Sequence, residues 1–191
     1  MRKPFVFKEP PPSRLVLALM WNPKFSLEEF IPKLQTIWGE IKSQSLVYDF
    51  IHTQYYKKEM GEGLRKVFIE INGLFSRDSL VGHKLKATEL ENKYLDENKN
   101  RLLNVDPLFV NLENIVISTS KAFSHRAYLE KGVYADVAFI WHTKHFEALP
   151  WTYPDYKQNV HYFEDVRAHL KNLLVAKNVL LQSHMQTFPP F

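Results

Sequence analysis

Short runs of apolar residues alternate with polar turns along this chain, and the spacing within each run predicts its secondary structure. The run from Arg14 to Trp21 (RLVLALMW) is almost continuously apolar, which is typical of a central strand buried on both faces. Other runs have the length, and several have the alternation, of strands. They lie at residues 43–51, 64–74, 114–119, 133–141 and 146–151, although residues 111–120 also fit a helix.

Three segments show helical spacing instead. Ser26 is a good N-cap, acidic residues follow it in the first turn, and Gly39 ends the predicted helix. Residues 78–95 form a second helix whose apolar positions fit the period in part. Residues 159–184 form one amphipathic C-terminal helix.

The opening order of strand, helix, strand, strand, helix, strand is that of the ferredoxin-like split βαβ unit. We therefore predict an α+β fold: a ferredoxin-like or related mixed or antiparallel sheet, with helices on one face and a C-terminal helix packed across it. Residues 14–184 are expected to form a single domain. Residues 1–13, which include three consecutive prolines, are expected to be an extended arm, and residues 185–191 a loose tail.

Composition narrows the classes of function. The 191 residues include 25 basic and 21 acidic side chains, for a net charge of +4. This charge is not gathered into one run as in a nucleic-acid stripe, so we expect no nucleic-acid partner. The absence of cysteine excludes disulfides and thiolate metal sites. No window is long and apolar enough for a membrane span, so we expect a cytoplasmic protein without a membrane partner.

The segment SKAFSHR places Lys121, His125 and Arg126 around a turn that follows an apolar strand. Arginine binds a phosphate or carboxylate through two bonds, lysine binds it as a point charge, and histidine can also move a proton. The segment therefore predicts an anion site. A solvated basic loop would have the same composition.

Asn104, Asp106 and Pro107 have the composition of a tight turn between apolar residues 102–103 and 108–110. Asp106 would there position a base, bind a cation or accept a hydrogen bond from a ribose. An aspartate in such a place also commonly serves only to cap the turn.

Two further segments combine aromatic rings with charge. The loop at residues 55–61 carries Tyr56 and Glu59 and could form a lid over a ligand. The segment WTYPDY holds Trp151, Tyr153 and Asp155 in a turn that a proline makes rigid. Its rings would either stack on a ligand or seal a helix onto the sheet.

Several common motifs are missing. There is no phosphate loop, no dinucleotide fingerprint and no serine in a nucleophile elbow. His142 and His145 flank a predicted hairpin turn, which is too little for a zinc site. We therefore predict no metal.

Seven spaced segments together carry a family resemblance: Tyr55-Tyr56 with Glu59-Met60-Gly61, Lys84-Leu85 with Glu89, Asn104-Val105-Asp106-Pro107, Lys121 with His125-Arg126, Tyr128-Leu129, Gly132-Val133-Tyr134-Ala135 and Trp151-Thr152-Tyr153-Pro154-Asp155-Tyr156. In this order they resemble a bacterial and archaeal family of uncharacterised proteins of about this length. Some members of that family are labelled GTP-binding, a label that the missing phosphate loop does not support. Leu108 departs from the family pattern, because a glycine is more typical after Asp106-Pro107.

The leading hypothesis is a protein that binds an anionic small molecule, a nucleotide or phosphorylated metabolite, and acts on it if it is an enzyme. The candidate catalytic groups are His125 and Asp106, and the candidate ligand-binding residues are Lys121, Arg126, Asn104, Tyr128, Trp151, Tyr153, Asp155, Glu59 and Tyr56. The alternatives are an RNA-binding module that uses a sheet face and an interaction subunit that docks a partner through the arm and the C-terminal helix. The sequence identifies neither a cofactor nor an oligomeric state.

Overall fold

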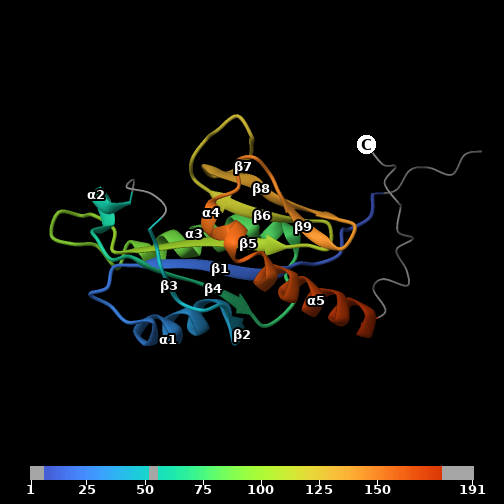
Figure 1. Ribbon diagram of the computed structural model, residues 1–191, viewed down its shortest axis with the longest axis horizontal. Coiled ribbons are helices and arrows are strands. Elements are labelled where there is room, and N and C mark those ends of the chain that lie inside the picture. Colours follow the sequence, from blue (N-terminus) through green and yellow to red (C-terminus); the bar gives the residue numbers. More distant parts are fainter. Residues whose placement is uncertain (1–6, 52–55, 178–191) are drawn as a thin grey trace, which may run out of the picture.

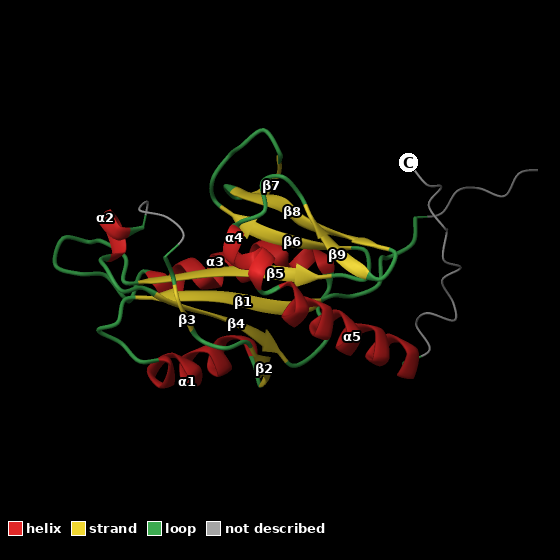
Figure 2. Ribbon diagram, in the orientation of Figure 1, coloured by secondary structure: helices red, strands yellow, loops and turns green. Residues whose placement is uncertain are grey.

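The computed structural model describes residues 7–51 and 56–177, which form one antiparallel sheet with helices packed on it (Figure 1). Figure 2 separates the helices from the strands. The strands are β1 (Arg14–Trp21), β2 (Ile41–Gln44), β3 (Tyr48–Asp49), β4 (Arg65–Ile71), β5 (Leu103–Val110), β6 (Asn114–Thr119), β7 (Arg126–Glu130), β8 (Val133–His142) and β9 (His145–Ala148). The helices are α1 (Leu27–Trp38), α2 (Lys57–Met60), α3 (Leu80–Glu91), α4 (Pro154–Gln158) and α5 (Val160–Ala176), and Arg77–Ser79 forms a short 3-10 turn before α3.

The strand order confirms the predicted α+β fold. Neighbouring strands follow the order β2-β4-β1-β5-β6-β8-β7, with β3 paired to β4 and β9 paired to β8. β4 lies between β1 and β2 and is antiparallel to both, which is the split βαβ arrangement. β6 to β9 then extend the sheet beyond β5.

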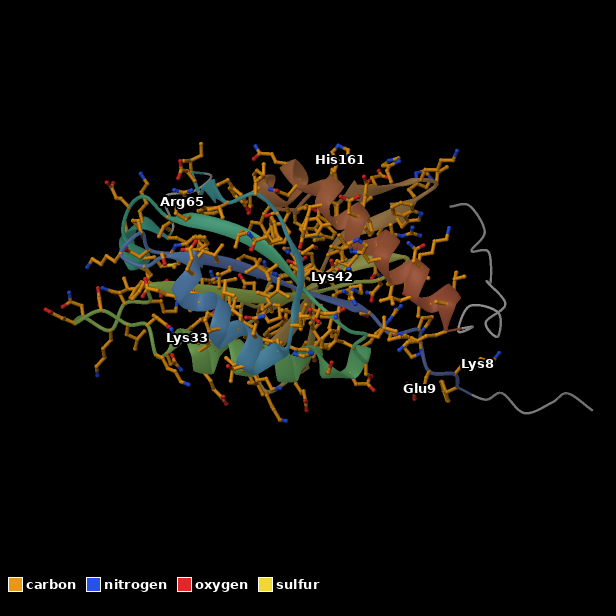
Figure 3. The ribbon with its side chains drawn as sticks, turned by 90° about the horizontal axis from the view of Figure 1, so that it is seen from below. Lys8, Glu9, Lys33, Lys42, Arg65 and His161 are labelled. Carbon is orange, nitrogen blue, oxygen red and sulfur yellow. The ribbon has the colours of Figure 1, made fainter. Side chains whose placement is uncertain are left out.

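Helices cover both faces of the central strands. Leu17 and Leu19 of β1 pack with residues of α1 and α3, whereas Val16 and Ala18 pack with residues of α4 and α5. Figure 3 shows α5, which carries His161, on the opposite side of the sheet from α1, which carries Lys33. The helices of the split βαβ unit thus share one face as predicted, and the C-terminal helix covers the other. Burial on both faces explains the continuous apolar run of β1.

The helices begin close to the predicted residues. At the start of α1 the Ser26 N–H donates to Glu29 Oε1 at 2.8 Å, half of a capping box. α3 is shorter than predicted, because the 3-10 turn precedes it and it ends at Glu91. α5 ends at Ala176, and the rest of the predicted helix (178–184) and the predicted tail (185–191) lie outside the described residues.

Three predictions of strands and loops were wrong. β5 runs straight through Asp106 and Pro107, where a turn was expected. The strand expected at residues 43–51 is broken between β2 and β3, because the Ser45 hydroxyl, and not a backbone carbonyl, accepts the Phe68 N–H at 3.0 Å. Arg126, expected beside a turn, begins β7 (126–130), for which no strand was predicted, because its largely exposed side chains give no apolar alternation.

The N-terminal segment joins the sheet at Ser13. Its N–H and carbonyl pair with Phe75 at 2.8 and 3.0 Å, and its hydroxyl donates to Asn111. Arg77 Nε also donates to the Pro11 carbonyl at 2.9 Å. The chain is therefore held in place from Pro11 onward, three residues before β1 begins.

Candidate functional site

β5 has a strand on only one side along its first half. β1 pairs with it from Leu103 to Val110, but β6 pairs with it only from Leu108 onward. Backbone groups on the unpaired side must find partners elsewhere, because a buried polar group without one is costly. We call this unpaired stretch, residues 103–107, the β5 gap.

Two side chains of α3 fill the place of the missing strand. Lys84 Nζ donates to the Val105 carbonyl at 3.0 Å, and the Val105 N–H donates to Glu91 Oε1 at 2.7 Å. Lys84 and Glu91 are both buried and lie 3.6 Å apart. The two side chains supply the hydrogen bonds of Val105 that a neighbouring strand would otherwise supply, as β6 does from Leu108 onward.

Pro107 fits into β5 because its nitrogen faces the same gap. Ser118 Oγ donates to the Pro107 carbonyl at 2.6 Å, so this carbonyl points away from β1. The nitrogen and carbonyl of one residue point to the same side of a strand. The ladder with β1 therefore loses no hydrogen bond to the proline.

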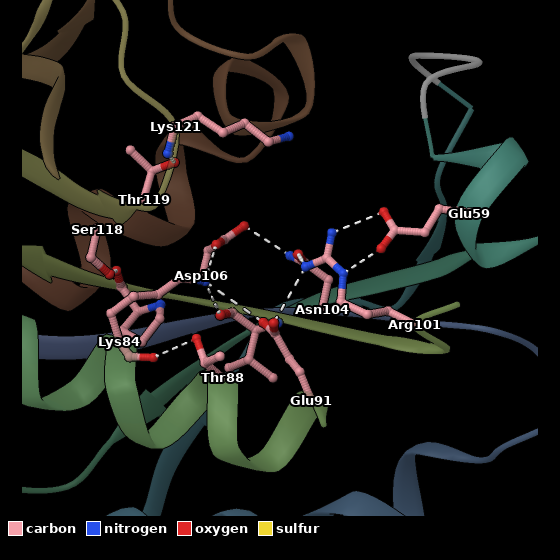
Figure 4. A network of polar contacts seen from close by, with 12 residues as sticks. Glu59, Lys84, Thr88, Glu91, Arg101, Asn104, Asp106, Ser118, Thr119 and Lys121 are labelled. Carbon is pink, nitrogen blue, oxygen red and sulfur yellow. Dashed lines mark hydrogen bonds and ion pairs between the residues drawn. The ribbon is translucent and has the colours of Figure 1, made fainter. Parts of the chain in front are cut away.

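Asp106 is at the centre of a polar network beside the β5 gap (Figure 4). Its Oδ1 accepts from Lys84 Nζ, and its Oδ2 accepts from Asn104 Nδ2, each at 2.8 Å. Arg101 donates to Asn104 Oδ1 at 3.1 Å and to both oxygens of Glu59 at 2.6 and 3.0 Å. The network thereby ties α2, α3 and the start of β5 together.

The network fixes the charge states of its members. Burial raises the pKa of Asp106, but the charge of Lys84 and the bonds from Lys84 and Asn104 outweigh it, so the pKa lies below its usual value. Burial lowers the pKa of Lys84, but Asp106 and Glu91 outweigh it and raise that pKa. Near neutral pH Asp106 is therefore ionised and Lys84 is protonated.

The network forms one wall of a cavity of about 400 Å³, a size found among small-molecule sites. Its charged lining consists of Lys66, Lys84, Arg101, Lys121, Arg126, Asp106, Asp136 and Asp155. Aromatic surface is added by Phe50, Tyr56, Phe123, Tyr153 and Tyr156. In Figure 4, Lys121 extends above Asp106 in the direction of α2.

A second buried ion pair lies on the α4 side of the cavity. Lys66 Nζ bonds to Asp155 Oδ2, which also accepts the Tyr48 hydroxyl at 3.0 Å. The ammonium lies 4.6 Å from the ring centre of Tyr156 and 5.1 Å from that of Phe50, so cation–π attraction adds to the ion pair. Pro154 begins α4 and positions Asp155 in its first turn.

The guanidinium of Arg126 bonds to three groups of the protein. Its Nε donates to Asp136 Oδ2 at 2.9 Å, its Nη1 to the Lys121 carbonyl at 3.0 Å, and its Nη2 to the Tyr153 hydroxyl at 3.1 Å. Its side chain is only 4% exposed, so it is not the surface cation that SKAFSHR suggested. It fastens β7, the loop after β6 and the start of α4 around the cavity.

His125 lies beside the cavity and not in its lining. Its ring is stacked between those of Phe123 and Trp151, with centres 5.9 and 4.8 Å away. Its Nε2 is 3.4 Å from Asp136 Oδ2. The geometry therefore gives His125 a supporting position next to the ion pair of Arg126 and Asp136.

The structure brings most of the predicted site residues to one cavity: Tyr56, Asn104, Asp106, Lys121, Arg126, Tyr153 and Asp155. Glu59 lies outside the lining and bonds to Arg101, which belongs to it. Trp151, like His125, also lies outside the lining. Tyr128 also lies outside it, on β7 against Tyr134.

Sequence reasoning missed Lys66, Lys84, Arg101 and Asp136 as cavity residues. Asp136 carried a usable signal, since it is a charged residue inside an otherwise mainly apolar strand. Lys66 gave a weaker one, because β4 also contains Arg65 and Glu70. The charge of Lys84 and Arg101 gave none, because each lies in a strongly charged segment, although Lys84 belongs to a segment of the family resemblance.

The described residues contain neither a group of metal ligands nor a membrane-spanning helix. Within 7–51 and 56–177, no three His, Cys, Asp or Glu side chains are grouped to hold a metal ion. No helix in these same ranges is long and apolar enough to cross a membrane.

Comparison with known proteins gives a family. No curated protein and no solved structure matches the chain. One family model matches residues 11–169, which include the whole cavity lining. The match agrees with the resemblance to uncharacterised proteins, and the chain belongs to the family described as domain of unknown function DUF4416.

Proposed function

We propose that this protein binds a small anionic molecule, a nucleotide or a phosphorylated metabolite, in the cavity beside the β5 gap. The observation that carries the proposal is the convergence of five basic side chains on one partly aromatic cavity that has only three acidic ones. Glu59 and Glu91 bond to Arg101 from outside the lining.

Lys121 is the proposed anion contact. Lys66, Lys84 and Arg126 are each held by a buried or nearly buried ion pair, with Asp155, Asp106 and Asp136 respectively. Lys121 is half-buried in the lining, on the loop after β6, where a ligand can reach it, and its ammonium lies 5.4 Å from the ring centre of Tyr56. A phosphate beside it would gain a charge-assisted bond and the attraction of the cations behind it.

Binding is better supported than acid–base catalysis. The lowered pKa of Asp106 makes it a weak base, and the raised pKa of Lys84 keeps that amine from acting as a nucleophile. The alternative of RNA binding on a sheet face is less favoured, because helices cover both faces of the central strands.

The test is to measure phosphate affinity with and without the Lys121 ammonium. Nucleotides and sugar phosphates are screened by thermal shift against their unphosphorylated counterparts, and dissociation constants are then measured by calorimetry. Lys121→Ala should weaken phosphate binding roughly tenfold, as expected for one lost charge-assisted bond. Lys144→Ala, which removes an exposed lysine between β8 and β9, is the control.

Two outcomes would refute the proposal. One is that no phosphorylated compound stabilises the wild-type protein more than its unphosphorylated counterpart does. The other is that Lys121→Ala and Lys144→Ala bind the phosphates equally well.

A further inference from the structure

One oxygen in the cavity wall is left without a donor. Asp136 is 3% exposed and lines the cavity. Its Oδ2 accepts from Arg126, but its Oδ1 is buried and has no hydrogen-bond partner among the described residues. Buried carboxylate oxygens without partners are rare in proteins, because losing hydration without a replacement bond is costly.

The surroundings hold Asp136 and its partner Arg126 in place. Asp136 lies on β8 between Arg126 of β7 and Ile117 of β6, so strand pairing on both sides fixes its backbone. Arg126 cannot turn to bind both oxygens, because its Nη1 and Nη2 are held by the Lys121 carbonyl and the Tyr153 hydroxyl. The geometry thus maintains an acceptor at the cavity wall.

We infer that Asp136 Oδ1 accepts a hydrogen bond from a hydroxyl group of the ligand, which is therefore a hydroxylated phosphate, such as a sugar phosphate or a ribonucleotide. The inference rests on the proposed function and specifies its ligand. A neutral hydroxyl suits the site better than an ammonium, because Arg126 already balances the charge of Asp136 and Lys121 belongs to the same lining. The phosphate would lie at Lys121 and the hydroxyl at Asp136.

A site built around a buried acceptor discriminates strongly against ligands that lack the donor. The acceptor stays unpaired when such a ligand excludes water from it, so the loss exceeds that of one ordinary bond. The expected signature is a preference between two phosphates that differ only in their hydroxyl groups.

The experiment uses two matched pairs of probes on the wild-type protein. The first pair is glycerol phosphate and propyl phosphate, and the second is adenosine monophosphate and its dideoxy counterpart. In at least one pair, calorimetry should show the hydroxylated member binding roughly tenfold or more tightly. Lys121→Ala should weaken both members of that pair by a similar factor and leave their ratio unchanged.

Asp136→Asn adds an independent readout. Its melting temperature without ligand shows whether it folds, and in a folded variant the preference for the hydroxylated member should shrink. If the variant does not fold, the ratio measured on the wild-type protein decides alone.

The outcomes separate this inference from the function on which it rests. Equal binding of both members of each pair would refute the hydroxyl contact, and would point to a trapped water at Oδ1, while phosphate binding would stand. Binding of none of the four phosphates would refute both. A preference that Asp136→Asn leaves intact in a folded protein would place the hydroxyl contact elsewhere and refute this assignment.

Discussion

At the scale of single residues, burial decides what a charged or titratable group can do. His83 is buried on α3, where its Nδ1 accepts from Trp38 Nε1 at 3.1 Å and its Nε2 lies 3.2 Å from Ser79 Oγ. A proton on Nδ1 would face the indole N–H directly. Burial, together with the charge of Lys86, lowers the pKa of His83 to about 4.

This gives a prediction for stability against pH. The unfolded imidazole binds a proton as the pH falls through 6.5, whereas the folded one does so only near pH 4. The contribution of neutral His83 to the free energy of unfolding is therefore complete above pH 6.5 and is lost as the pH falls from 6.5 to about 4. The loss is on the order of 3 kcal/mol. His83→Asn keeps an acceptor for Trp38 without titrating, so its urea midpoint should fall less over that range than that of the wild type.

The control is His161→Asn, because the His161 side chain is 91% exposed on α5. It should follow the wild-type curve. Parallel curves for wild type and His83→Asn would mean that His83 takes up its proton equally in both states.

At the scale of elements, the β5 gap depends on α3. Lys84 and Glu91 bond the backbone of Val105 and lie within 4 Å of each other. Breaking a buried ion pair leaves an unpaired charge, and here it also leaves an unpaired carbonyl in the sheet. α3 is thus held to β5 by polar bonds as well as by apolar packing.

We expect Lys84→Met to lower the free energy of unfolding by about 3–5 kcal/mol, the usual cost of removing one partner of a buried pair. Lys86→Met on the same helix removes an exposed lysine and should change it by less than about 0.5 kcal/mol. Urea denaturation measures both variants. Similar losses for the two would show that Lys84 is not needed to hold the unpaired edge.

The elements differ in how far the sequence could predict them. β1 and α1 follow local rules, namely a doubly buried run and a capped amphipathic helix, and were placed within a residue or so of the described bounds. β5 could not be recognised, because Asp106-Pro107 has turn chemistry. The partners on its unpaired side are side chains of α3 and β6, which the local sequence does not indicate. Asn104 and Asp106 thus line the cavity, although they were singled out from a turn that does not exist. Lys84 was missed because only packing distinguishes it from its solvated neighbours.

At the scale of the whole molecule, apolar side chains pack on both faces of one sheet, and the chain before β1 is bonded to residues that follow β4 and β5. Ser13 is buried and joins the chain before β1 to two other segments, through backbone hydrogen bonds to Phe75 and a hydroxyl bond to Asn111. The predicted arm therefore includes a residue that the sheet holds by backbone and side-chain bonds.

A chain that begins at Pro10 should keep its melting temperature within about 2 °C of the full protein, because Ser13 and the Pro11 carbonyl remain. A chain that begins at Arg14 loses these bonds and should melt at least about 4 °C lower, since each 1 kcal/mol corresponds to roughly 2–4 °C at this size. Differential scanning calorimetry of both chains measures the difference. Identical melting temperatures would show that Ser13 contributes nothing to stability.

The β5 gap bears on whether copies of this protein associate with one another. An unpaired stretch of strand is a template on which another chain can add a strand of its own, the first step of many aggregates. Here Lys84 and Glu91 already bond to the backbone carbonyl and N–H of Val105, and Pro107 has no N–H that could pair with an added strand. Lys84, Glu91 and Pro107 allow β5 and β6 to separate here, and the same three residues hinder the pairing of another chain with this edge. Replacing these residues would leave backbone groups of β5 unpaired at the wall of the cavity, where another strand could add.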